Sequence, residues 1–216
     1  SHIDGNVSLN AFNDRRPSLE VEHTMLNGQW SISNSALNLN QSLYTSLQLT
    51  LNDAYLIAHE IKQAIDGEGS IKLKSSNSHV ALNQISAQGN IESENDELYL
   101  GEAIWQNDDT TTPLLTTNLG EVFVYNSQLQ SAYTLFNHKG NGELFLTNTI
   151  WTGQPVLDID EETAQSLAVN LGRLFLDNTL IEDSRESGVA LYLGRTSSLT
   201  ALQSQIRYQT DFGIYS

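Results

Sequence analysis

The chain has 216 residues, 39% of them hydrophobic and 17% charged, a balance typical of a folded domain and not of a disordered segment. Ten Lys and Arg against 26 Asp and Glu give a net charge of -16, which argues against nucleic acid as a partner because the chain repels phosphates. The lack of Cys excludes disulfides and thiolate metal sites, and the lack of a run of about 18 apolar residues argues against membrane insertion.

A short pattern occurs four times: Gly, then two apolar residues at alternate positions, then Asn followed by Ser or Thr. The copies are GQWSISNSAL (28–37), GEVFVYNSQL (120–129), GELFLTNTIW (142–151) and GRLFLDNTLI (172–181). Looser copies lie near residues 49, 69, 98 and 200. Steps of 19 to 30 residues separate the first apolar positions, which are Trp30, Leu49, Ile71, Leu98, Val122, Leu144, Leu174 and Thr200.

Each copy alternates apolar and other residues, which predicts a strand with one buried face. A repeat of this length, in which one unit cannot bury its own apolar face, predicts a solenoid. Helical repeats, leucine-rich repeats and propeller blades fit the spacing poorly. We therefore expect an all-β chain, a right-handed parallel β-helix of about eight coils in one domain over residues 3–216, after Ser1 and His2, which resemble a tag remnant.

The Asn of the pattern stands just after the predicted strand, where the chain has to turn. We expect an inward-facing ladder of Asn34, Asn126, Asn148 and Asn178, whose amides bond the turn backbone and the next coil. The preceding glycines fit corners that need a positive φ; they are Gly28, Gly120, Gly142 and Gly172.

The strings GELFLTNTI, GRLFLDNTLIEDSRESGVALYL and RYQTDFGIYS resemble coils of the pectin-lyase-like right-handed β-helices, including the passenger domains of bacterial autotransporters. The resemblance covers most of the chain, from about Gly5 to Ser216. It implies a secreted protein, extracellular or on the cell surface of a Gram-negative bacterium. The F-x-x-N pattern also resembles chlamydial polymorphic membrane proteins, but their G-G-A-I motif is present only as GEAI and GVAL, so that family is not assigned.

Three segments depart from the simple repeat. Residues 53–66 place Ile57, Ile61 and Ile65 on one helical face, but the short step between neighbouring copies favours a strand there. Longer loops are expected near 101–118 and 152–170, and the second of these has room for a short helix. Neither end resembles a polar cap, so we expect a fragment of a longer solenoid.

The sequence lacks the signatures of the enzymes that share this fold. Of the polygalacturonase motifs only a partial match, NDD at 107–109, is present, and the pectate-lyase motifs W-x-D-H and R-x-P-x-x-R are missing. No G-x-S-x-G or phosphate-binding loop occurs. Asp158, Asp160 and Glu161 offer enough oxygen for Ca²⁺, but they lack the spacing of known calcium loops, so a solvated acidic turn is the favoured alternative.

The residues between the two buried positions should point outward, because side chains alternate along a strand. Coil by coil they are Ser31, Thr50, Lys72, Tyr99, Phe123, Phe145, Phe175 and Ala201. Four stacked aromatic rings would then line one sheet. The favoured interpretation is that a loop, another domain or a subunit covers them. The alternative is a platform for sugar rings or a partner protein, with polar contacts from Glu121, Glu143, Arg173 and Asp177.

These observations predict an adhesive or structural module that binds a polysaccharide or a surface protein through many weak contacts, with self-association as a further expectation. The alternative is a polysaccharide depolymerase, a lyase or glycoside hydrolase of the kind found in phage tailspikes. Such an enzyme would need two carboxylates about 5–10 Å apart in a cleft. A third possibility is a spacer without a ligand.

Overall fold

The structure is a computed structural model that describes residues 1–11, 16–64, 69–132, 136–139, 142–153, 166–170, 172–183, 189–208 and 212–215. These residues form strands and turns and contain no helix, so the prediction of an all-β chain is confirmed. Accordingly, no helix among them is long and apolar enough to cross a membrane. The strands build two sheets, of nine and 17 strands, whose pairings are parallel.

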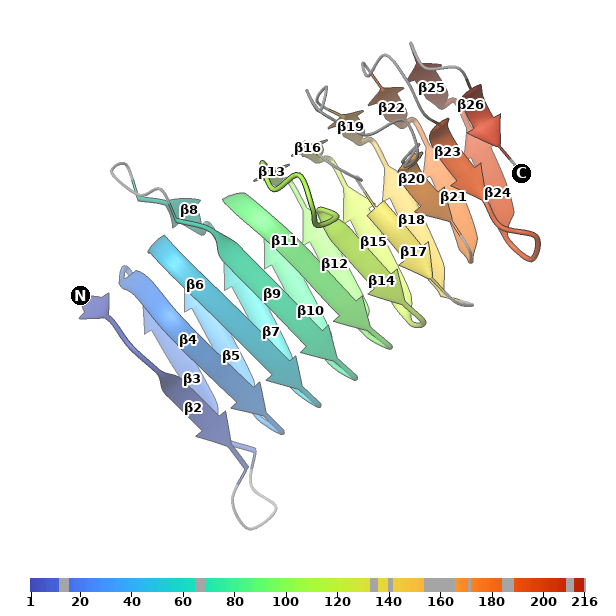
Figure 1. Cartoon of the computed structure of the whole chain (residues 1–216). Coiled ribbons are helices and arrows are strands. Elements are labelled where there is room, and N and C mark those ends of the chain that lie inside the picture. Colours follow the sequence, from blue (N-terminus) through green and yellow to red (C-terminus); the bar gives the residue numbers. More distant parts are fainter. Residues whose placement is uncertain are drawn as a thin grey trace.

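The smaller sheet, sheet I, contains nine strands of five residues each that lie side by side along the molecule (Figure 1). They are β3 (Ser18–Glu22), β5 (Ala36–Asn40), β7 (Tyr55–His59), β10 (His79–Asn83), β12 (Glu97–Gly101), β15 (Glu121–Tyr125), β18 (Glu143–Thr147), β21 (Arg173–Asp177) and β24 (Ser198–Leu202).

The larger sheet, sheet II, has two rows of strands. The first row contains β1 (His2–Ile3), β8 (Lys62–Gln63), β13 (Ile104–Asn107), β16 (Gln128–Ser131), β19 (Ile150–Gly153), β22 (Leu180–Asp183) and β25 (Gln205–Tyr208). The second row contains β2 (Val7–Asn10), β9 (Ile71–Ser76), β14 (Leu115–Asn118), β17 (Phe136–Lys139), β20 (Ser166–Asn170), β23 (Val189–Leu193) and β26 (Phe212–Tyr215). Three longer strands run through both rows: β4 (Met25–Ser33), β6 (Leu43–Asn52) and β11 (Ser86–Glu94).

The chain alternates between the two sheets. After each strand of sheet I it follows the first row of sheet II, then the second row, and then returns to sheet I one position further along (Figure 1). We call each such passage a circuit. Because successive circuits pair in parallel, equivalent residues lie side by side: Leu98 pairs with Val122, Val122 with Leu144, and Leu144 with Leu174.

The core lies between the sheets and is filled by alternate residues of the strands. In sheet I the buried residues include Leu98 and Leu100 of β12, and their partners in β15, β18 and β21 are equally enclosed. Sheet II contributes the fully buried rings of Trp30, Trp105 and Trp151. The predicted alternation of these strands is therefore correct, and the residues between the buried positions face outward.

The Asn ladder differs from the prediction in orientation. Asn126, Asn148 and Asn178 have φ of 51°, 51° and 47°, and their side chains are exposed on the outside of the turn after sheet I. Asn34 has φ of 50° but lies at the other corner, after sheet II, and is also exposed. A left-handed residue at these corners turns its side chain to solvent. The Ser or Thr that follows, such as Thr149, is the residue that is buried.

The exposed amides still form a ladder. The Nδ2 atom of Asn148 donates to Oδ1 of Asn126 at 3.2 Å, and Nδ2 of Asn178 donates to Oδ1 of Asn148 at 2.8 Å. The backbone N–H of Asn126 donates to the carbonyl of Thr147 in the next circuit at 3.0 Å. The ladder therefore joins neighbouring circuits from the outside of the molecule.

Gly28 does not lie at a corner between the sheets. It lies within β4, at the bend between the two rows of sheet II, and has φ of 103°. A Cβ atom there would meet the carbonyl oxygen of Gly5 at 2.1 Å, so the neighbouring backbone leaves no room for a side chain. Gly120, in contrast, lies between β14 of sheet II and β15 of sheet I and has φ of 72°, as expected for a corner.

The first apolar positions of the eight predicted repeats lie in two different sheets. Trp30, Leu49 and Ile71 belong to sheet II, whereas Leu98 and the later positions belong to sheet I. The predicted outward residues before Tyr99, which are Ser31, Thr50 and Lys72, therefore lie in sheet II and not in the column of sheet I. In sheet I that column begins with Glu20, Asn38, Ile57 and Ala81, continues through the four predicted aromatic residues, and ends at Thr200 instead of Ala201.

The segments outside the repeat are strands where they are described. Within residues 53–66, β7 and β8 replace the competing helix; Ile57 is 53% exposed and Ile61 is buried. Residues 101–118 include β13 and β14, joined by a connection at 108–114. Most of the segment 152–170, including Asp158, Asp160 and Glu161, lies outside the described residues.

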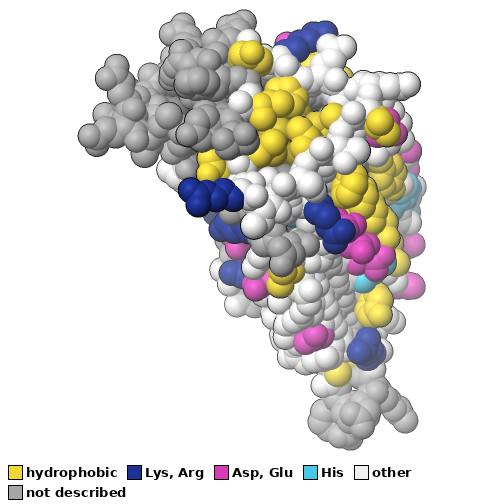
Figure 2. Space-filling view, turned by 90° about the vertical axis from the view of Figure 1, so that its right-hand side faces the viewer, with side chains coloured by type: hydrophobic (Ala, Val, Ile, Leu, Met, Phe, Trp, Pro, Cys, Tyr) yellow, Lys and Arg dark blue, Asp and Glu magenta, His cyan; other side chains and the backbone are white. Residues whose placement is uncertain are grey.

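The C-terminal end of the described chain exposes apolar side chains. Figure 2 looks onto this end and shows them gathered there. Leu199 and Ile206 occupy the inward columns of Leu174 and Ile181, yet they are only partly buried. Burial in the interior columns thus depends on having a circuit on each side.

Candidate functional site

Four aromatic rings form a continuous stack on the outer face of sheet I. The ring centroids of Tyr99 and Phe123 are 4.9 Å apart, those of Phe123 and Phe145 are 4.8 Å apart, and those of Phe145 and Phe175 are 4.6 Å apart. The planes of successive rings differ by only 7° to 9°. Each ring is partly exposed, so the predicted aromatic column exists and borders solvent.

The stacked geometry limits what this column can bind. Because the rings are parallel and in contact, the faces of Phe123 and Phe145 are covered by their neighbours. Solvent meets the edges of these rings, whereas a sugar stacks on an aromatic face. We therefore do not expect a saccharide to stack on the centre of the column, although its edges remain an apolar surface.

One margin of the column carries charges in register. Glu97, Glu121 and Glu143 lie side by side in successive strands, followed by Arg173. A guanidinium nitrogen of Arg173 forms an ion pair with the Glu143 carboxylate. On the opposite margin, the ring of Tyr125 lies where a Cβ atom at Gly101 would be, so the glycine makes room for it.

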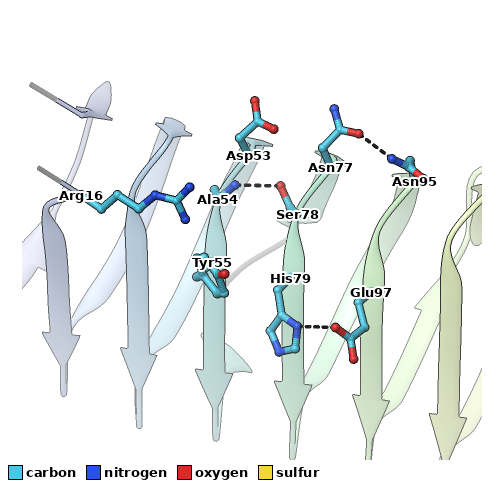
Figure 3. A pocket seen from close by; sticks show the side chains of 9 residues that line it. All are labelled: Arg16, Asp53, Ala54, Tyr55, Asn77, Ser78, His79, Asn95 and Glu97. Carbon is cyan, nitrogen blue, oxygen red and sulfur yellow. Dashed lines mark hydrogen bonds and ion pairs between the residues drawn. The ribbon is translucent and has the colours of Figure 1, made fainter. Parts of the chain in front are cut away.

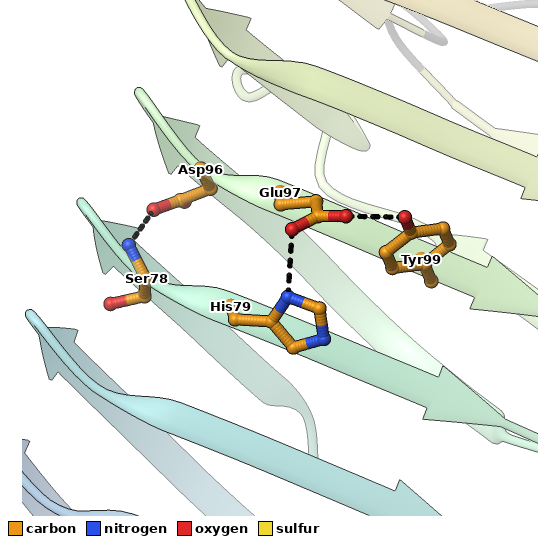
Figure 4. A network of polar contacts seen from close by, with 5 residues as sticks. All are labelled: Ser78, His79, Asp96, Glu97 and Tyr99. Atoms are coloured by element: carbon orange, nitrogen blue, oxygen red, sulfur yellow. Dashed lines mark hydrogen bonds and ion pairs between the residues drawn. The ribbon is translucent and has the colours of Figure 1, made fainter.

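The Glu97 carboxylate joins the column to a second group of side chains. It accepts a hydrogen bond from the Tyr99 hydroxyl, and its Oε2 atom lies 3.0 Å from Nδ1 of His79 (Figure 4). The hydrogen bond from Tyr99 and, to a smaller extent, the contact with His79 lower the pKa of Glu97. The same hydrogen bond raises the pKa of Tyr99. Glu97 is therefore held ionised.

The row of rings continues beyond Tyr99 toward the N-terminal end of sheet I. The ring centroid of His79 lies 5.7 Å from that of Tyr99 and 5.8 Å from that of Tyr55. The Arg16 guanidinium carbon lies 5.9 Å from the centroid of Tyr55, within the range of a cation–π contact. Unlike the stacked phenylalanines, Tyr55 is 47% exposed.

A hollow of about 370 Å³ lies beside Tyr55 and His79, where the chain passes from sheet II to sheet I (Figure 3). At its rim, Nδ2 of Asn95 donates to Oδ1 of Asn77 at 2.7 Å. The hollow is lined by Arg16, Asp53, Ala54, Tyr55, Asn77, Ser78, His79, Asn95 and Glu97. It therefore combines two aromatic rings with amide, carboxylate and guanidinium groups.

A buried carboxylate supports the wall of the hollow. Asp96 Oδ1 accepts a hydrogen bond from the backbone N–H of Ser78 at 2.7 Å (Figure 4). Its Oδ2 atom accepts from the hydroxyls of Ser93, at 2.8 Å, and Ser75. The Ser78 hydroxyl in turn accepts from the N–H of Ala54 at 3.2 Å. These hydrogen bonds connect the corners at Ala54, Ser78 and Asp96. They therefore also fix the positions of the next residues, Tyr55, His79 and Glu97.

The repeat pattern of the sequence does not predict this hollow. Its signal is a second short pattern, in which Asp53-Ala54-Tyr55, Asn77-Ser78-His79 and Asn95-Asp96-Glu97 occupy equivalent corners. In each, the first residue is left-handed and exposed, the second is buried, and the third begins a strand of sheet I with its side chain outward.

Two exposed carboxylates have a displaced pKa: Glu97 at the hollow, and Asp109 in the connection between β13 and β14. Glu97 and Asp109 both have a lowered pKa, Asp109 because of hydrogen bonds from Thr111 and Thr112. A general acid of a glycoside hydrolase needs the opposite shift. Among the described residues no group of three His, Cys, Asp or Glu side chains is arranged to hold a metal ion.

No protein-family model matches the sequence, and neither the curated proteins nor the solved structures include a match to it.

Proposed function

We propose that the chain is a right-handed parallel β-helix from a secreted or cell-surface bacterial protein, and that it acts as a rigid module that binds polysaccharide. The parallel pairing of successive circuits supports the β-helix, and sheet I, with nine strands, corresponds to about one coil per strand. The bacterial surface location rests on the resemblance of the repeat strings to autotransporter passenger domains.

The observation that carries the proposal is the hollow beside Tyr55. Sugar sites combine an aromatic surface with a few fixed polar groups that accept and donate hydrogen bonds. The hollow has this composition, with an exposed Tyr55 ring, the Asn77 and Asn95 amides, and Arg16. It extends over three circuits, so a linear polymer lying along the sheet would contact equivalent groups repeatedly.

Affinity electrophoresis tests the proposal. Wild-type protein and a Tyr55→Ser, His79→Ser variant are run through native gels cast with a panel of bacterial and host polysaccharides. A matched Gln48→Ser, Thr50→Ser variant changes two outward residues of β6 in sheet II and serves as the control. Retardation of the wild type and the control, lost in the hollow variant, supports binding at the hollow. Equal retardation of all three proteins, or no retardation in any gel, contradicts it.

The same gels distinguish binding from cleavage. Polymer loss around the band after staining would favour the polysaccharide depolymerase over a binding module. The lowered pKa of Glu97 gives no support to that reading, because an ionised carboxylate cannot donate a proton to a leaving group.

A further inference from the structure

The outer face of sheet I has a second feature, which shares only Glu97 with the lining of the hollow. We define the acidic-aromatic strip as the carboxylates of Glu97, Glu121 and Glu143 together with the adjacent rings of Tyr99, Phe123, Phe145 and Phe175. In each of the first three strands, the acid and the ring are two residues apart and face the same way. The strip therefore presents an apolar row with a negative margin.

The charges of this margin are only partly compensated within the chain. Glu97 contacts His79 and Tyr99, and Glu143 is paired with Arg173. Glu121 lies directly between these two carboxylates and is exposed, and its own carboxylate has no hydrogen-bond or ion-pair partner among the described residues. Like charges directly opposite each other in neighbouring strands destabilise a sheet. A cation placed at Glu121 would remove this repulsion.

The negative net charge of the molecule indicates that a partner at the strip should be cationic. A second copy of this chain would bring another net charge of -16, and its own strip has the same acidic margin. Self-association through this face is therefore disfavoured by electrostatics. An apolar partner with a cationic margin complements both the rings and the carboxylates.

The spacing of the strip selects a helix over a strand. Successive rings are 4.9, 4.8 and 4.6 Å apart along the strip. Residues i and i+3 of an α-helix are separated by about 4.5 Å along its axis, and one turn advances about 5.4 Å. Same-face residues of an extended chain are about 6.6 Å apart, so their positions shift out of step with the strip within two circuits. We propose that the acidic-aromatic strip docks a cationic amphipathic α-helix of a partner protein.

The probe is a synthetic helix of about 18 residues built from Leu and Lys, with Leu on one face and Lys at its margin. A peptide of the same composition in scrambled order has no apolar face. Fluorescence anisotropy measures the binding of each labelled peptide to the full 216-residue chain. We expect the amphipathic helix to bind at least tenfold more tightly than the scrambled peptide; equal affinities overturn the proposal.

Two charge variants locate the binding. Glu121→Gln removes the central carboxylate of the strip, and Glu94→Gln removes an exposed carboxylate at the end of β11 in sheet II, with the same change in net charge. We expect Glu121→Gln to weaken helix binding about three- to fivefold, the value of one exposed ion pair, and Glu94→Gln to leave it unchanged. Equal effects of the two variants would show a general attraction to an acidic protein and would overturn the proposal.

Two more variants separate this site from folding defects and from the hollow. Phe123→Leu keeps an apolar side chain but removes the ring, and thermal unfolding confirms whether the variant is folded. A Tyr55→Ser variant changes the hollow but leaves the contact between His79 and Glu97 in place, so it should bind the helix as the wild type does. If this variant binds the helix more weakly than the wild type, the hollow and the strip form one site, and the proposal of a separate strip is wrong.

Discussion

The buried side chain of His138 illustrates how a single residue sets a pH limit on the fold. Its Nε2 atom lies 2.9 Å from the carbonyl oxygen of Gly142, so this nitrogen carries the proton. Its Nδ1 atom then accepts from the Thr117 hydroxyl at 2.6 Å. Both ring nitrogens are thus satisfied in the neutral form. Burial lowers the pKa of His138 below its ordinary value of 6.5, although the bond to Gly142 partly offsets this effect.

We predict that the free energy of unfolding decreases as the pH falls below 6.5. The unfolded chain takes up a proton at this histidine before the folded chain does, so protonation favours unfolding between 6.5 and the lower folded pKa. The loss can reach about 1.4 kcal/mol per pH unit in that window and is absent at higher pH. Urea unfolding from pH 8 to pH 5, compared with a His138→Gln variant, measures it. Identical pH profiles for the two proteins would refute this assignment.

At the scale of residues, the sequence identified the corners but not the direction of their side chains. Asn126, Asn148 and Asn178 were recognisable as turn residues because Asn tolerates the left-handed conformation. The path of the backbone at the corner points the Asn side chain outward and buries the side chain of the residue that follows. The sequence does not show that path, so the direction of the side chain could not be predicted from it. Glu102 and Gln84 occupy the same conformation without any sequence signal for it.

At the scale of elements, the aromatic stack adds stability as well as a binding surface. Phe145 has a stacked ring on each side, Phe123 and Phe175, whereas Phe175 has a stacked ring only on the side of Phe145. Aromatic pairs contribute about 0.5–1.5 kcal/mol each beyond the area that they bury. The column therefore stabilises the pairing of the four strands that carry it.

We predict that Phe145→Leu destabilises the chain more than Phe175→Leu does. Both substitutions keep a partly buried apolar side chain of similar size, so the difference between them reports one additional stacked pair, about 0.5–1.5 kcal/mol. Denaturant unfolding of the two variants measures the difference in free energy. Equal destabilisation would mean that the rings contribute through burial alone.

The sequence predicted the register of the strands that carry the aromatic column. It did not predict which strands belong to sheet I and which to sheet II. Strands β12, β15, β18 and β21 of sheet I share a strong pattern of apolar, aromatic and apolar residues, so their register could be predicted. Strand β24 lacks the aromatic residue, and its outward residue is Thr200 instead of the predicted Ala201. The strands of sheet II alternate in the same way, because they also bury one face, and nothing local distinguishes Leu49 from Leu98. The same ambiguity hides the hollow, because it lies at the corner where the chain passes from sheet II to sheet I and the two patterns meet.

At the scale of the whole molecule, stability depends on contacts between neighbouring circuits. Strand pairings connect each circuit to the one before and the one after, as the pairing of β18 with β15 and β21 shows. In such arrays, stability is approximately a sum of local units and their interfaces. Interior circuits should therefore open less often than the circuits at the two ends, where Leu19 and Leu199 are only partly buried.

One column allows this gradient to be tested with the same substitution at two places. Leu144 and Leu199 both belong to the inward column that includes Leu174, but Leu144 is completely buried. We predict that Leu144→Ala costs about 2–5 kcal/mol and increases amide exchange in the circuits on both sides of it, because it leaves a cavity between them. Leu199→Ala should cost less and increase exchange only near β24 and its neighbours. Hydrogen exchange with peptide-level mass spectrometry resolves the two patterns, and a uniform increase across the chain in both variants would show that the circuits unfold as one cooperative unit.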